Sequence, residues 1–442
     1  MPASRDRRGG IVLLSSLAAV AIGLVGLSTL SDSSDTGTPG DGHPPSPGES
    51  TVPPTNSEMA PGTEAAAAAS PTAPVSTVAI TPTTVSTTTV TTTVAAQPPD
   101  DGLSSDERRL VPAFTISDPD LQPKSVVIGP DGLVFTQNMM YRHNVAVFDS
   151  DGGPVATIDD TVDLADFGHS EVSRVVRGSP VEAAVTPDGR HVWVSNYKMY
   201  GPGYTSIADD ECGRGDWEDS FVYRISLDTF EIDAVVPTGA VPKFLAVSPD
   251  NTRLVVANWC GFDASVIDTE ALVELGRIDL GRHPRGVAIA SDSRTAYVTV
   301  MGAERIDVID LESLEVIDSL VGSGITPRHI ILSPDESVLY SSNHLMDTVR
   351  KIDLETGELL DSVRTGTQTR TMAMADDGRS LYVVNYRDGT FSKVATEDMT
   401  VLQTVSIGGR PIGVAYDPTT RRVWVADYSG TLHVFDDVDP AG

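Results

Sequence analysis

A short pattern recurs along this chain and constrains its fold more than any single motif does. In most copies a proline opens an apolar stretch, an acidic turn follows, and a second apolar stretch ends on Asn or Asp, as in TPRHIILSPDESVLYSSN (326–343). The turn residue recurs at Asp131, Asp188, Asp250, Asp292, Asp335 and Asp377, and in altered form at Pro418-Thr419. The last four intervals are 42, 43, 42 and 41 residues, and the first two, of 57 and 62 residues, carry insertions. A repeat of this period indicates an array of similar units.

Each copy contains four short runs that are typical of β-strands. In the fifth copy they are RHIILS (328–333), SVLYSSN (337–343), TVRKID (348–353) and ELLDSV (358–363). Val, Ile, Leu and Tyr dominate these runs, and Asp, Gly, Pro and Thr fill the turns. Four such strands per copy predict the blade of a β-propeller. A solenoid is the alternative, but its parallel coils are usually shorter and lack three hairpins per unit.

The number of copies sets the number of blades. The copies open near Pro123, Pro180, Pro242, Pro284, Pro327, Thr369 and Pro411. We therefore expect an all-β fold, a seven-bladed β-propeller of four-stranded blades.

The two ends of the repeat array are both irregular. The last copy supplies three strands, at 411–417, 421–427 and 431–436, and an unassigned strand, LVPAFTI (110–116), precedes the first copy. Pairing that strand with the last copy would complete its blade and remove an exposed sheet edge. We expect this pairing to close the ring.

The N-terminal quarter of the chain has a different composition. Arg5, Arg7 and Arg8 precede a mostly apolar run at 11–30, which predicts a signal peptide or a signal anchor over 1–31. A retained run would contact the membrane, and a cleaved one would release the protein, so we expect an extracytoplasmic protein that is either membrane-anchored or secreted.

A polar linker is expected between this leader and the repeats. Residues 32–107 are rich in Thr, Pro, Ser and Ala, which predicts a disordered segment. Its Thr run at 86–96 offers sites for sugars, although a plain spacer fits as well. The propeller is then expected over 108–438.

Charge excludes one class of partner. The chain has 62 acidic and 31 basic residues, a net charge of −31. A nucleic acid would be repelled by such a protein, so it is not an expected partner.

The second strands carry a family resemblance. LYVVN (381–385), AYVTV (296–300), LVVAN (254–258) and VWVSN (192–196) resemble the second strand of the YVTN-repeat (YncE-like) seven-bladed propellers of bacterial exported and surface proteins. The resemblance covers about 110–436 and implies this fold. It does not imply one activity, because the family includes proteins with no known activity beside relatives of quinoprotein-dehydrogenase and lactonase propellers.

Blade geometry predicts which residues meet at the central channel. The first strand of each blade lines the channel, so the residue after each opening position is expected at one mouth. These residues are Lys124, Val181, Lys243, Arg285, Arg328, Arg370 and Ile412. Five are cations, whereas the acidic turns lie at the opposite face, so we expect a cationic mouth and an acidic underside. The alternative is that each Arg stacks on a neighbouring blade or pairs with a nearby acid.

Aromatic residues follow the second strands at the same end. Tyr197, Trp259, Tyr386 and Tyr428 would surround the mouth outside the cations. Aromatic and Arg side chains together are typical of binding hot spots, and packing between blades is the competing explanation.

Three histidines belong to the same region. His283, His329 and His344 are candidates for a metal site or a general base, but no metal-ligand spacing supports this. We expect rim histidines without a catalytic role, with His283 in a loop that faces solvent.

Two cysteines lie in equivalent turns of adjacent blades. Cys212 is in an insertion at 198–220, and Cys260 follows Trp259. In an exported chain this predicts a Cys212–Cys260 disulfide beside the mouth, with free thiols as the alternative. The acidic tip Asp209–Glu211 is more typical of solvated acids than of a metal site.

These observations predict a binding or scaffold protein whose ligand or partner sits at the cationic, aromatic mouth. The predicted ligand-binding residues are Lys124, Lys243, Arg285, Arg328, His329, Arg370, Tyr197, Trp259, His344, Tyr386 and Tyr428. The expected partner is an anionic small molecule, an envelope polymer or an acidic protein segment. We expect no catalytic residue, no cofactor and no metal. The alternatives are a propeller enzyme at the same mouth (a lactonase-like hydrolase, a lyase or a quinoprotein-dehydrogenase-like oxidoreductase) and a purely structural surface module.

Overall fold

A computed structural model describes residues 101–119, 121–139, 142–169, 174–204, 212 and 217–441. The predicted leader at 1–31 and the acidic tip Asp209–Glu211 lie outside the described residues, as does nearly all of the predicted linker. Across the described ranges, no helix combines the length and the apolar character needed to cross a bilayer.

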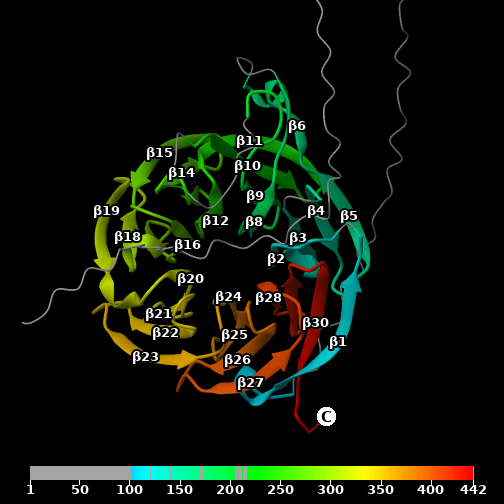
Figure 1. The fold of residues 1–442 in the computed structure, drawn as a ribbon, viewed down its shortest axis with the longest axis vertical. Helices are drawn as coiled ribbons and strands as arrows, with labels where there is room; N and C mark the ends of the chain where they lie inside the picture. Colours follow the sequence, from blue (N-terminus) through cyan, green and yellow to red (C-terminus); the bar gives the residue numbers. More distant parts are fainter. Residues whose placement is uncertain are drawn as a thin grey trace, which may run out of the picture. The chain divides into compact units, whose positions relative to one another are not determined.

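The described strands form seven four-stranded antiparallel sheets arranged around an axis, as Figure 1 shows. Blade 1 contains β2 (Ser125–Ile128), β3 (Val134–Asn138), β4 (Asn144–Phe148) and β5 (Pro154–Asp159). Blade 2 contains β8 (Pro180–Val185), β9 (His191–Asn196), β10 (Asp219–Ser226) and β11 (Glu231–Ala240). Blade 3 contains β12 (Pro242–Val247), β13 (Arg253–Asn258), β14 (Asp263–Asp268) and β15 (Val273–Asp279).

The remaining four blades repeat the same order from the axis outward. Blade 4 contains β16 (Pro284–Ile289), β17 (Thr295–Val300), β18 (Arg305–Asp310) and β19 (Glu315–Leu320). Blade 5 contains β20 (Pro327–Leu332), β21 (Val338–Asn343), β22 (Thr348–Asp353) and β23 (Leu359–Arg364). Blade 6 contains β24 (Thr369–Met374), β25 (Ser380–Asn385), β26 (Thr390–Ala395) and β27 (Val401–Ser406). Blade 7 contains β28 (Pro411–Asp417), β29 (Arg422–Asp427), β30 (Thr431–Val438) and β1 (Arg109–Ser117). The predicted all-β, seven-bladed architecture is confirmed.

Blade 7 joins the two ends of the repeat array. The N-terminal strand β1 pairs antiparallel with β30, with Leu110 opposite Asp437 and Ile116 opposite Leu432. In Figure 1 the cyan β1 lies beside the red β30. The outermost strand of the last blade is therefore supplied from before the first blade, as expected, and β30 has no open edge.

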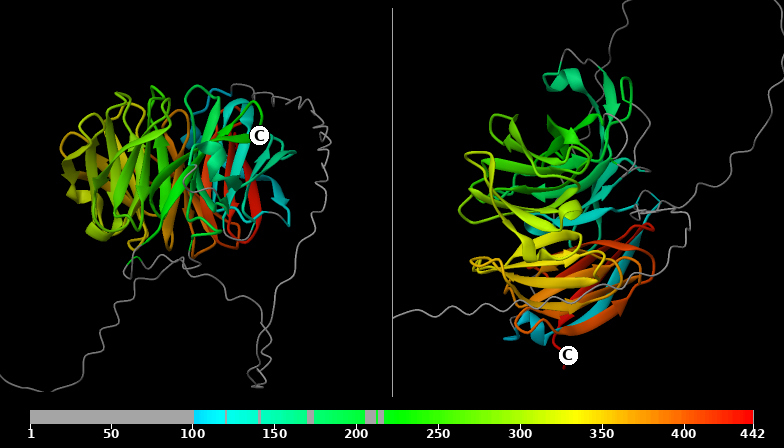
Figure 2. Two further views of the ribbon diagram at one scale, coloured as in Figure 1. Left: turned by 90° about the horizontal axis from the view of Figure 1, so that it is seen from above. Right: turned by 60° about the vertical axis from the view of Figure 1, so that its left-hand side comes forward.

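Stacking of the blades explains the burial pattern. The middle strands are covered on both faces, so β13 is buried at every position after Arg253, and the outer strands are partly exposed. Apolar side chains of neighbouring blades meet between the sheets, for example Val255 of blade 3 and Val298 of blade 4. Seen edge-on in Figure 2, left, the strands run between two layers of connecting loops.

Short elements complete the fold. The hairpin β6 (Thr161–Asp163) and β7 (Val175–Arg177), with the 3-10 turn η3 (Leu164–Phe167), is inserted between blades 1 and 2. Further 3-10 turns are η1 (Ser105–Glu107), η2 (Pro130–Gly132), η5 (Met301–Ala303) and η6 (Val321–Ser323).

Candidate functional site

Hydroxyl groups between blades fix the backbone of the predicted mouth residues. The Ser195 hydroxyl of blade 2 donates to the carbonyl oxygen of Lys243 in blade 3 (2.6 Å). The Ser342 hydroxyl of blade 5 does the same to Arg370 in blade 6 (2.5 Å). From the inner strands, Ser125 and Thr371 donate to the carbonyl oxygens of Val181 and Ile412. Four blades thus help to position the mouth residue of the next blade, although the two residues are far apart in sequence.

A strained turn precedes four of the cations. The residue two positions before the cation has a left-handed backbone in blades 3 to 6: Val241 (φ 55°), His283 (φ 64°), Thr326 (φ 52°) and Gln368 (φ 59°). For non-glycine residues, and β-branched ones above all, this conformation costs about 1–3 kcal/mol and persists only where the surroundings impose it. The same bend in four consecutive blades gives the four cations equivalent backbone positions.

All five predicted cations are buried. Their exposed fractions are 4% for Lys124, 1% for Lys243, 5% for Arg285, 5% for Arg328 and 2% for Arg370. The sequence placed these residues at the mouth but did not predict their burial. An apolar cluster lies at the same end, formed by residues of several blades and of the blade 2 insertion: Met139, Val181, Tyr197, Cys212, Ala240, Val241, Cys260, Ile412 and Tyr428. We call the five cations with this cluster the mouth.

Three of the four predicted aromatic residues contact cations of the mouth. Lys243 Nζ lies 4.2 Å from the ring centre of Tyr197 and 5.5 Å from that of Trp259. The Arg370 guanidinium carbon lies 3.6 Å from the ring centre of Tyr386. Cation–π contacts of this kind hold a positive charge in a place where water is excluded.

The aromatic set is not uniform. Tyr197 and Tyr428 are buried within the apolar cluster, and Trp259 and Tyr386 are half-buried at its edge. Packing between blades and contact with the cations, which the sequence presents as competing explanations, therefore occur together.

Glu182 is an acidic residue beside these cations that the sequence did not indicate. Glu182 in β8 has 5% of its surface exposed. Its Oε1 atom lies 3.8 Å from Lys124 Nζ and 3.7 Å from Arg285 Nη2. Glu182 directly follows the predicted mouth position Val181, so aligning the next position of every blade would have found it.

The predicted histidines occupy three different environments. His329 is 8% exposed, and burial, then the charges of Arg285 and Arg328, lower its pKa to about 3. The ring of His283 stacks on Trp259 with a centroid distance of 4.3 Å and is half-buried, so the expectation that it faces solvent is wrong in part. His344 is 7% exposed. Among the residues that can be described, no three His, Cys, Asp or Glu side chains are grouped as metal ligands.

The predicted disulfide is confirmed. Cys212 and Cys260 are bonded, with a Cα–Cα distance of 5.1 Å. Both are buried in the apolar cluster of the mouth, at 6% and 7% exposure. The bond attaches the blade 2 insertion to the turn that carries Trp259.

The acidic residues of the opposite face interact with residues near them. Asp188 and Asp335 accept hydrogen bonds from hydroxyl or amide groups of their own turns, which lowers their pKa values. Acids of the third strands form ion pairs with arginines at the start of the second strands or just before it: Asp268 with Arg253, Asp310 with Arg294 and Asp436 with Arg422. These acids shape turns and neutralise nearby arginines.

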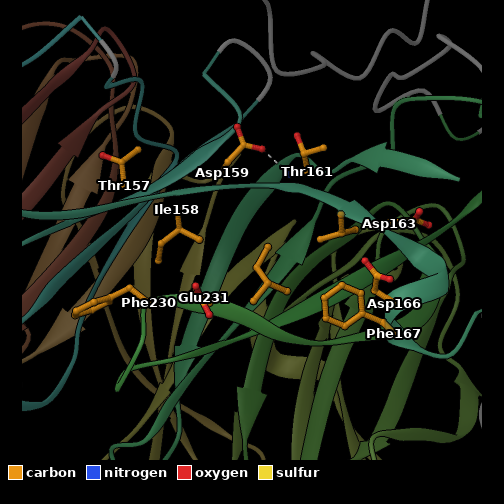
Figure 3. A pocket seen from close by; sticks show the side chains of 11 residues that line it. Thr157, Ile158, Asp159, Thr161, Asp163, Asp166, Phe167, Phe230 and Glu231 are labelled. Atoms are coloured by element: carbon orange, nitrogen blue, oxygen red, sulfur yellow. Dashed lines mark hydrogen bonds between the residues drawn. The ribbon is translucent and has the colours of Figure 1, made fainter. Parts of the chain in front are cut away.

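A surface pocket of about 380 Å³ lies away from the mouth, between β5, β11 and the inserted hairpin (Figure 3). Asp159, Asp163 and Glu231 are among its acidic residues, and Phe167 and Phe230 are aromatic. Asp159 pairs with Arg177 at 3.6 Å and Asp163 caps η3, so two of the acids have structural roles. The mouth is the stronger candidate site.

Comparison with known proteins supports the fold. No family model matches the chain. It is 24% identical to Antigen Lp49 of Leptospira interrogans over 229 residues, 47% of this chain and 50% of that protein. It is 28% identical to the seven-bladed beta-propeller protein Rv1057 of Mycobacterium tuberculosis over 134 residues, 29% of this chain and 33% of that protein. The chain thus matches about half and one third of the length of these relatives.

Solved structures give the same result. Hydrazine synthase of Kuenenia stuttgartiensis aligns with a TM-score of 0.56 and 17% identity, covering 72% of this chain and 96% of that one. A chain of the mitotic checkpoint complex aligns with a TM-score of 0.60 and 14% identity, covering 81% and 99%. At these identities the likeness shows the fold alone. The β-propeller fold is consistent with a scaffold or binding role in general.

Proposed function

We propose that this chain is an exported β-propeller of the YVTN-repeat type that binds an anionic ligand at its mouth. The fold supports a binding role in general, and the mouth supplies the chemistry. On this proposal the N-terminal segment 11–30 directs export, and the propeller works outside the cytoplasm, either anchored or released.

The observation that carries the proposal is the gathering of five buried cations in a protein of net charge −31. They come from blades 1, 3, 4, 5 and 6, and their charge acts on neighbouring groups, since Arg285 and Arg328 help to lower the pKa of His329. Charges interact strongly where water is scarce, so an anion placed near several buried cations is attracted by each of them. A carboxylate or a phosphate is therefore a suitable ligand group.

The burial of the mouth favours a particular form of ligand. The cations are buried, and Lys243 and Arg370 contact aromatic rings, so a small anionic group reaches them more easily than a broad surface does. A free organic acid, the charged end of an envelope polymer and an acidic protein segment all present such a group.

The enzymatic alternative finds less support. A general base is most effective when its pKa lies near the working pH, and that of His329 is about 3. We therefore propose binding rather than catalysis.

A thermal-shift experiment on the full chain tests the proposal. Citrate and inorganic phosphate are expected to raise the melting temperature above that in KCl of equal ionic strength, because a ligand stabilises the state that binds it. The shift should decrease in Arg328→Gln and Arg370→Gln. Arg294→Gln is the matched control, because Arg294 pairs with Asp310 at the opposite face and its side chain is 56% exposed.

The result that contradicts the proposal is equally clear. If neither anion shifts the melting temperature beyond KCl, or if Arg328→Gln and Arg370→Gln respond like the wild type, anion binding at the mouth is wrong.

A further inference from the structure

We propose that Glu182 is an internal counter-ion of the mouth, which the carboxylate group of a ligand displaces. The inference rests on the proposed function and identifies the residue that competes with the ligand. It also assigns carboxylates as the ligand class.

The first observation is the convergence of two distant cations on one oxygen. Lys124 belongs to blade 1, Glu182 to blade 2 and Arg285 to blade 4, and both cations lie within 4 Å of Glu182 Oε1. All three side chains are buried, with 4% to 7% of their surface exposed. This oxygen therefore marks a point where cations from different blades can act on the same carboxylate.

The second observation is how loosely the carboxylate is held. Distances of 3.7 and 3.8 Å are too long for hydrogen bonds, and the described part of the chain supplies no hydrogen bond to the Glu182 carboxylate. Charge alone attracts it to Lys124 and Arg285. A competing anion would have no directional bond to break.

A second buried pair in the same molecule shows the contrast. Lys393 Nζ lies 2.6 Å from Asp437, both side chains are 0% exposed, and the Tyr382 hydroxyl also donates to Asp437 (2.6 Å). That pair has the short, hydrogen-bonded geometry that a permanent buried ion pair needs. Glu182 lacks this geometry.

The third observation is that the fold does not require an acid at this position. The residues that follow the mouth position in the seven blades are Ser125, Glu182, Phe244, Gly286, His329, Thr371 and Gly413. Glu182 is the one acid in this set of described residues. A small, apolar or neutral polar side chain serves the same place in the other blades, so the charge of Glu182 is a property of the mouth.

Its position indicates the class of ligand. Lys124 and Arg285 already attract one carboxylate, that of Glu182. A ligand carboxylate can therefore take the same place. A mouth without the Glu182 charge has one positive charge more to offer to the ligand. The structure therefore predicts that removing this charge strengthens carboxylate binding.

Calorimetric titration of the full chain tests the inference, with citrate as the carboxylate probe and inorganic phosphate as the comparison, both at an ionic strength fixed with KCl. Glu182→Gln is expected to bind citrate at least tenfold more tightly than the wild type. Glu231→Gln removes the same charge from an exposed position in the outer strand of the same blade and should bind like the wild type.

Each outcome decides a different point. If Glu182→Gln binds citrate no better than the wild type, while Arg370→Gln weakens binding, the inference is wrong and the proposed function stands. If its affinity increases for phosphate alone, the carboxylate assignment is wrong. If no variant and no wild-type protein binds either anion, the proposed function fails and the inference with it.

A second measurement covers the possibility that Glu182→Gln folds poorly. Its melting temperature should then rise more steeply with citrate concentration than that of the wild type, since the ligand replaces the lost counter-ion. Equal slopes would overturn the inference.

Discussion

At the scale of single residues, the molecule uses buried charge in two ways. At the mouth, two of the buried cations, Lys124 and Arg285, lie near the loosely held carboxylate of Glu182. Between blades 6 and 7, Lys393 and Asp437 form a close pair, and Lys393 also donates to the carbonyl oxygen of Arg108 (3.0 Å). The first arrangement suits an exchangeable ligand and the second suits permanent structure.

The Lys393 pair provides a stability prediction. Burial lowers the pKa of Lys393, which shows how poorly its surroundings solvate charge. Lys393→Met would leave Asp437 buried without its cation, so we expect the free energy of unfolding to fall by about 3–5 kcal/mol. Urea denaturation measures this loss, and a change below about 1 kcal/mol would show that the pair is not a structural element.

Asp160 and His143 predict a dependence of stability on pH. Burial raises the pKa of Asp160 to about 6. Burial also opposes charge on His143, but the hydrogen bond and charge of Asp160 outweigh it and raise the pKa of His143. Both groups hold protons to a higher pH in the folded state than in the unfolded chain, so their contribution to stability decreases as pH rises.

The size of this effect follows from Asp160. Its pKa rises from 3.8 to about 6, which corresponds to a stabilisation of about 3 kcal/mol at low pH. This stabilisation is lost between about pH 4 and pH 7. The difference in unfolding free energy between the wild type and Asp160→Asn, measured by urea denaturation across this range, should change by this amount. Parallel curves for the two proteins would contradict it.

At the scale of elements, glycines allow the inner strands to approach one another. A Cβ atom on Gly286 of β16 would lie 2.8 Å from the carbonyl oxygen of Arg328 and 3.0 Å from the Cα of His329 in β20. Gly413 of β28 is as close to the backbone of Ser125. Backbone atoms cannot move aside as a flexible side chain can, so the spacing of neighbouring blades at the mouth depends on these glycines.

Gly286→Ala is therefore expected to separate blades 4 and 5 and to lower the free energy of unfolding by about 1–3 kcal/mol. Gly276→Ala is the control, because its Cβ would meet the flexible Leu314 Cδ1 at 3.0 Å. Urea denaturation of both variants tests this prediction. An equal effect of the two substitutions would mean that the close approach at the axis has no special role.

At the scale of the whole molecule, the repeat predicts more than any motif does. The seven blades, the closing strand and the disulfide follow from spacing, from an unassigned strand and from two cysteines in equivalent turns. The burial of the mouth does not follow, because it depends on Met139, Tyr197, Ile412 and other residues that meet only after the ring closes. The low pKa of His329 has the same origin, because it results first from burial and then from the charges of Arg285, which comes from another blade, and Arg328.

The central claim is that cations from separate blades act together on one anion. Calorimetric titration of citrate into the full wild-type chain and into a variant with Arg285→Gln, Arg328→Gln and Arg370→Gln, at fixed ionic strength, tests it most directly. We predict measurable binding by the wild type and a loss of at least a hundredfold in the variant. Equal affinities, in a variant whose circular dichroism matches that of the wild type, would contradict the claim.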